Sequence, residues 1–245
     1  MRRNRFIPWG LVGGIGFFIG AFAYLNGARY FLMQDQEMSY SVFDLFSFVG
    51  VNKKFDTYDY LSSDYPFLYF NLFVFVMIGL MMSCSSFLLR PKSYLSFFYT
   101  RYPSFKQANH YLRGSTVGCT FVYTLAYFIG IFCLSQGRFI YSFSDLIAVQ
   151  WIGILVNLVL KVCLIEALKQ FIFVIYLKKE AAIAFVVGAL SIFSLIIIDL
   201  IFPFSCFILF DESGEAICMI VPFVLIKFGL NWITNNRIKI NDVII

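Results

Sequence analysis

The side chains that could carry out catalysis are few in this chain of 245 residues, which contains a single histidine, His110. A metalloprotease in a membrane needs a cluster of His and Glu side chains on helices to hold its metal. A serine hydrolase needs a histidine base within hydrogen-bond reach of its nucleophile. One histidine in a basic segment supplies neither arrangement, and Gly13-Gly14-Ile15-Gly16 lacks the Lys-Ser or Lys-Thr pair of a phosphate loop. We therefore expect no catalytic residue, metal or cofactor in this chain.

Three ionisable residues within apolar stretches could act in ion or proton transport: Lys161, Asp199 and Lys227. A charge in lipid is costly and often marks a transport pathway or a pair between helices. We expect Lys161 near the inner end of its stretch, where a long side chain can reach the membrane surface, and Asp199 near an outer end. None lies clearly at mid-membrane. A transport role and an interfacial or helix-pairing role therefore both remain open.

Four glycines near the N-terminus form two small-xxx-small spacings, Gly10 with Gly14 and Gly16 with Gly20. Such spacings put glycines on one face of a helix and let another backbone approach closely. The pattern predicts a tight helix–helix contact, within the chain or across an oligomer. Chance spacing in a glycine-rich helix is the alternative.

The segment 90–114 is basic and aromatic, and it contains the start of a helix. Ser104 is a plausible N-cap for a helix of about two turns from Phe105 to Leu112. Two interpretations stay open for this short amphipathic helix: it lies on anionic headgroups, or it docks into a cytoplasmic partner. Its expected apolar face is Phe105, Ala108 and Leu112, and its expected polar face is Lys106, Asn109 and Arg113.

Composition places the elements that carry these residues in a membrane. The chain is 60% hydrophobic and 13% charged, with a mean hydropathy of +0.81. A soluble domain of this length has too much surface for so few charges. About 20 residues of helix cross a bilayer core, so we predict an all-α, polytopic membrane protein with a single transmembrane domain over 1–245. The six expected spans are about 6–25, 67–89, 115–134, 146–165, 181–202 and 216–233.

The distribution of charge predicts the orientation of these spans. The N-terminus, the segment 90–114, the connection after the fourth span and the C-terminus are basic, whereas the first and fifth connections are acidic. Because basic loops stay inside, both ends are expected in the cytoplasm of a multi-pass cell-membrane protein. Pro203 is expected to break the fifth span before a short re-entrant or interfacial piece. A disulfide between Cys206 and Cys218 is left open.

Six spans, an amphipathic helix after the second span and a broken segment after the fifth resemble the permease subunits of ABC-2-type exporters. More narrowly, the chain resembles the small permeases of bacteriocin and lantibiotic immunity or peptide-export systems. The stretch Tyr99-Thr-Arg-Tyr-Pro-Ser-Phe-Lys-Gln-Ala-Asn109 resembles the basic Arg-aromatic-x-Ser-x-Lys segment of many such permeases.

The resemblance implies a transport subunit that is not itself an enzyme. The short helix would be the coupling helix, seated in a separate cytoplasmic ABC ATPase that binds ATP and magnesium. A second permease subunit, identical or homologous, would complete a pathway for an amphipathic peptide or lipid-like cargo, with no role for nucleic acid. The implied contacts with the ATPase are Tyr99, Arg101, Ser104, Phe105 and Lys106.

A rival hypothesis needs no ATPase. The chain would then be a membrane binding or immunity protein that captures a peptide or small substrate. A membrane enzyme with an unrecognised site and an assembly factor are further alternatives. Co-purification of an ATP-hydrolysing partner separates the exporter from the first rival.

Overall fold

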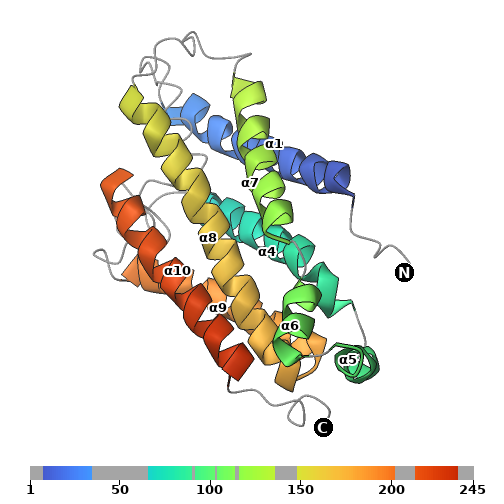
Figure 1. Cartoon of the computed structure of the whole chain (residues 1–245). Coiled ribbons are helices and arrows are strands. Elements are labelled where there is room, and N and C mark those ends of the chain that lie inside the picture. The colour runs from blue at the N-terminus through green and yellow to red at the C-terminus, as the bar shows by residue number, and fades with distance from the viewer. Residues whose placement is uncertain are drawn as a thin grey trace.

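The computed structural model describes residues 8–34, 66–89, 92–102, 104–113, 116–135, 148–201 and 213–236. These residues form eight α-helices and no β-strand, which confirms the all-α prediction (Figure 1). Six helices are long and two are short. The long ones are α1 (Trp9–Gln34), α4 (Pro66–Leu88), α7 (Thr116–Ser135), α8 (Ala148–Lys178), α9 (Ala181–Ile201) and α10 (Ser213–Asn236), and the short ones are α5 (Lys92–Tyr99) and α6 (Phe105–Arg113).

The six long helices coincide with the six apolar stretches expected from the sequence, but α1, α8 and α10 are longer than expected. α1 continues to Gln34, and α8 continues to Lys178, well beyond the end expected for its span. Pro222 lies inside α10 without ending it. The expected break at Pro203, the piece after it and Cys206 lie outside the described residues, so the break and the disulfide stay predictions.

Two of these helices are long and apolar enough by themselves to cross a membrane. The qualifying segments are Trp9–Asn26 in α1 and Val117–Leu134 in α7, with mean hydropathies of 1.4 and 2.0. Core helices of soluble proteins pass the same test, but they are mostly buried. Here only 28% and 39% of the two segments are buried. Shorter apolar segments lie at Phe70–Ser85 in α4 and Ala181–Leu195 in α9.

The pairs of residues in contact give the relative directions of the helices. α8 packs along α10 and also contacts α4 (Figure 1), and all three helices run the same way. The pairs that fix this are Gly79 with Ile165 and Phe87 with Phe173 for α4 and α8, and Glu166 with Lys227 and Gln170 with Thr234 for α8 and α10.

The remaining long helices run the opposite way. α9 reverses α8 through the two-residue connection at Lys179 and Glu180. Similar pairs set the direction of the other two: Tyr127 with Phe75 and Tyr123 with Gly79 for α7 against α4, and Gly16 with Tyr123 and Gly20 with Tyr127 for α1 beside α7. Each long helix, α10 included, therefore runs opposite to the long helix before it in the chain.

Aromatic side chains fill the centre of the bundle. Tyr123 stacks on Phe75 and donates a hydrogen bond of 2.9 Å to its backbone carbonyl. Buried Tyr127 also packs on Phe75, with ring centroids 4.4 Å apart. A buried tyrosine needs a partner for its hydroxyl, and the Phe75 carbonyl satisfies Tyr123 in place of water. These contacts hold α4 against α7.

Candidate functional site

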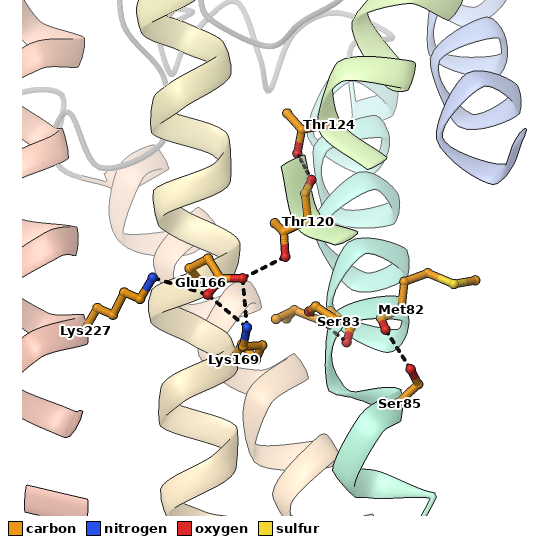
Figure 2. A network of polar contacts seen from close by, with 9 residues as sticks. Met82, Ser83, Ser85, Thr120, Thr124, Glu166, Lys169 and Lys227 are labelled. Atoms are coloured by element: carbon orange, nitrogen blue, oxygen red, sulfur yellow. Dashed lines mark hydrogen bonds and ion pairs between the residues drawn. The ribbon is translucent and has the colours of Figure 1, made fainter. Parts of the chain in front are cut away.

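Four polar side chains meet inside the bundle and form an ionic cluster, defined here as Thr120, Glu166, Lys169 and Lys227 (Figure 2). Lys169 Nζ donates to both carboxylate oxygens of Glu166, at 2.8 and 2.9 Å. Thr120 Oγ1 donates to Glu166 Oε1 at 2.8 Å. Lys227 Nζ lies 3.3 Å from Glu166 Oε2. One carboxylate therefore joins α7, α8 and α10.

The local sequence explains how α8 presents this cluster. Glu166 and Lys169 are three residues apart on one helix, a spacing that places their side chains on the same face. One turn further along α7, Thr124 Oγ1 donates to the backbone carbonyl of Thr120 at 2.9 Å. The side chains of Thr120, Glu166 and Lys169 are buried. A buried carboxylate is tolerated because three donors satisfy it.

The cluster carries an excess of positive charge, with one carboxylate between two ammonium groups. Its members differ in access: the side chains of Glu166 and Lys169 are 3% and 5% exposed, whereas that of Lys227 is 36% exposed. The excess charge thus reaches the outside of the bundle at Lys227. Such a group can attract an anion without first breaking the Glu166–Lys169 pair.

Two lysines lie elsewhere than the sequence suggested. Lys161 was expected near a membrane surface, but it is buried near the middle of α8, with its ammonium 5.6 Å from the centre of the Phe128 ring. Lys169 was expected in a connection between helices and is instead a buried residue of α8. Both differences follow from the extra turns of α8 beyond Ile165.

The other predicted charges have separate outcomes. Lys227 takes part in a pair between helices, which is one of the two roles left open for it. Asp199 lies in α9, but its side chain is outside the described part of the chain. The structure therefore brings Lys227 to the ionic cluster, whereas the ammonium of Lys161 lies 5.6 Å from the centre of the Phe128 ring.

The glycines of α1 divide into two pairs. A Cβ added at Gly16 or Gly20 would collide with the backbone carbonyl of Tyr123 or Tyr127 in α7. A Cβ at Gly10 or Gly14 would meet nothing within 4 Å. Gly16 and Gly20 thus make the tight helix contact within the chain. α7 also contributes a glycine to this contact, because a Cβ at Gly130 would collide with the Phe17 carbonyl of α1.

The short helices α5 and α6 form what we call the inner loop, residues 92–113. Ser104 caps α6, because its Oγ accepts a hydrogen bond of 3.2 Å from the Gln107 amide. This confirms the predicted start of the helix. Tyr99, at the end of α5, donates a hydrogen bond to Asn109 Oδ1 and stacks on Phe105, with ring centroids 4.8 Å apart. α5 itself was not predicted.

Burial within the inner loop corrects the expected faces of α6. Asn109 was expected on the polar face, but it is fully buried beside Ala108 and bonds Tyr99. Tyr99 is only 4% exposed and Phe105 is partly buried, so both hold the inner loop together. The predicted partner contacts that are exposed are Arg101, Ser104 and Lys106.

Two grooves border these groups. A polar groove of about 640 Å³ separates α6 from the end of α10, and His110 and Lys106 line it with Asn231 and Asn235. An apolar groove of about 450 Å³ lies between α8, α9 and α10, beside the ionic cluster. Among the residues that the structure describes, no three His, Cys, Asp or Glu side chains gather as a metal site would require.

Reasoning from the sequence missed Glu166 and Thr120. Glu166 follows directly after the expected end of the fourth span, so it was assigned to neither a span nor a basic connection. The available signal was an acid and a lysine three residues apart between apolar runs, which suggests an internal pair. Nothing in the sequence marks Thr120 as their partner 46 residues away.

Comparison with known proteins identifies no relative. No protein-family model, no curated protein and no solved structure matches this chain.

Proposed function

We propose that the chain is a six-span permease subunit of an ATP-binding-cassette exporter in a cell membrane. Both ends and the inner loop would lie in the cytoplasm, and a separate ATPase would drive transport of an amphipathic cargo. The surface supports the membrane part of this proposal. Charged side chains are buried in the bundle while large apolar ones are exposed on every long helix, as lipid favours and water does not. Examples are Phe18, Met81, Phe121, Leu155, Leu190 and Phe228.

The directions of the helices also support six crossings. A chain that crosses a membrane repeatedly must reverse at every span, and the long helices here do so. α6, the connection between α8 and α9, and the end of α10 lie at the same end of the bundle (Figure 1). A six-span chain with both termini inside would place these three segments on its cytoplasmic side, in agreement with the basic residues of α6 and of the connection between α8 and α9.

The observation that carries the transport proposal is the way α6 is attached. α6 contacts both α4 and α10, and its Ala108 is fully buried. Its exposed residues Lys106, Gln107 and His110 line the open groove that borders the end of α10. A partner that moved α6 would therefore act on α10, which carries Lys227, and on α4 in the core. This is the mechanical connection that a coupling helix needs.

Co-purification with a cytoplasmic ABC ATPase of the host cell tests the proposal. Lys106→Glu reverses an exposed charge, so we expect it to lower the amount of retained ATPase by about tenfold or more. Phe105→Asp is a poorer choice, because Phe105 packs on Tyr99 and its loss would disturb the inner loop. Lys178→Glu is the matched control, an exposed lysine at the same end of the bundle, and should retain the ATPase.

The contrary results are equally clear. Full retention of the ATPase by Lys106→Glu, and by Arg101→Glu with it, would refute the assignment of α6. Absence of any ATPase from gently solubilised wild-type protein would favour the ATP-independent binding or immunity protein.

A further inference from the structure

The apolar groove between α8, α9 and α10 lies open on the outside of the bundle. Its walls are apolar side chains, among them Phe171 of α8, Leu190 and Leu195 of α9, and Phe223 and Leu230 of α10. Such a lining favours a hydrocarbon occupant, because burying apolar surface gains about 25 cal/mol per Å².

Two serines also line the groove, but both are engaged by their own helix. Ser191 Oγ donates to the Val187 carbonyl and Ser194 Oγ to the Leu190 carbonyl, each at 2.8 Å. The wall therefore presents no free hydroxyl proton from these residues to a polar ligand. An extended peptide in this groove would leave its backbone amides without partners, which costs free energy.

Positive charge lies at the edge of the groove. Lys227 is four residues after Phe223 and three before Leu230, so it shares their face of α10. On α8, Ala167 and Leu168 of the lining follow Glu166 directly. Because Lys169 already balances the charge of Glu166, the partly exposed Lys227 ammonium is the excess cation of the ionic cluster.

From these contacts we infer that the groove binds the tail of a single-chain amphiphile whose anionic headgroup contacts Lys227. The charge of Lys227 selects the headgroup, and the groove accepts the hydrocarbon. This inference rests on the proposed placement of the bundle in a membrane, and it names a substrate class for the proposed transport. It requires no ATPase, so its failure and that of the coupling assignment are separate results.

Photolabelling of the purified full chain in detergent tests this inference. The probes are palmitate and hexadecanol that carry the same diazirine on the tail, used in alkaline buffer so that the palmitate carboxyl is ionised. We expect palmitate to label groove residues such as Phe171 and Phe223 about fivefold more strongly than hexadecanol does. This factor is the largest gain in affinity that a partly exposed ion pair usually gives.

Variants separate the contributions of headgroup and tail. Lys227→Gln should remove the preference for palmitate but leave hexadecanol labelling unchanged, whereas Leu190→Trp should fill the groove and lower labelling by both. If Lys227→Gln does not fold, Lys227→Arg must keep the preference. Equal labelling of the wild type by both probes, or labelling spread evenly over other apolar faces such as Phe18 and Phe228, would overturn the inference.

Discussion

Thr120 of α7 donates a hydrogen bond of 2.8 Å to the Glu166 carboxylate of α8, across 46 residues of sequence. The same carboxylate pairs with Lys169 in its own helix and Lys227 in α10. Three helices thus converge on one acidic group in an environment with little water. Removing that group should affect the whole bundle, because its partners were desolvated to meet it.

Replacement of Glu166 by glutamine should strongly destabilise the protein. The Lys169 ammonium would remain buried without a counter-charge, and breaking a buried pair in this way typically costs about 3–5 kcal/mol. Denaturant unfolding in detergent micelles, followed by circular dichroism, measures the loss. Glu180→Gln is the matched control, since Glu180 is exposed in the connection between α8 and α9, and it should change stability little. Equal stability of both variants would show that the ionic cluster does not hold the helices together.

Alanine at Gly16 or Gly20 should separate α1 from α7. The added methyl group would collide with a backbone carbonyl, and such overpacking costs about 1–3 kcal/mol. Gly14→Ala meets open space instead, and it should stabilise α1 by about 0.5–1 kcal/mol, the usual gain over glycine within a helix. Thermal unfolding of the three variants measures these effects. The same sign of change for Gly14 and Gly20 would contradict the packing of α1 on α7.

Loss of the cap at Ser104 should loosen the start of α6. Ser104→Ala removes the acceptor for the Gln107 amide, and such caps contribute about 1 kcal/mol. Amide hydrogen exchange at Gln107 should accelerate about fivefold as a result. Ser104→Asp restores an acceptor and should keep slow exchange. Unchanged exchange in Ser104→Ala would mean that tertiary contacts alone fix this end of α6.

The lysines should differ in their reactivity toward an amine-directed acylating reagent. Lys161 and Lys169 are buried, while Lys178 and Lys179 at the end of the same helix are exposed. Mass spectrometry of the folded protein should therefore find the second pair modified and the first pair protected. Modification of all four at one rate in the folded state would place Lys161 and Lys169 at the surface, as reasoning from the sequence had suggested.

The long helices could be predicted from the sequence because apolar runs of this length have one stable form in lipid, in which the backbone satisfies its own hydrogen bonds. The extension of α8 could not. Hydropathy falls at Glu166 and Lys169, and the expected span ended there, but the two charges satisfy each other inside the bundle. The helix therefore continues through them to Lys178.

In the inner loop, too, the local features could be predicted from the sequence and the tertiary contacts could not. The cap at Ser104 is a local signal and was predicted, whereas the burial of Asn109 depends on Tyr99, ten residues away. Ala108 and Asn109 are neighbours on the helix, so an assignment of faces by spacing alone placed the boundary between them. The glycine spacing predicted that α1 would pack tightly against another helix. It did not predict that this helix would be α7, since any helix could have supplied the contact.

Chemical labelling of the inner loop tests the central claim most directly. Lys106→Cys places a thiol on the exposed face of α6, and Lys178→Cys places a second one at the same end of the bundle. A membrane-impermeant maleimide applied to intact cells should label neither variant above the wild-type background, and both should react once the membrane is opened. Reaction of Lys106→Cys in intact cells would put the inner loop outside, where no cytoplasmic ATPase could reach it.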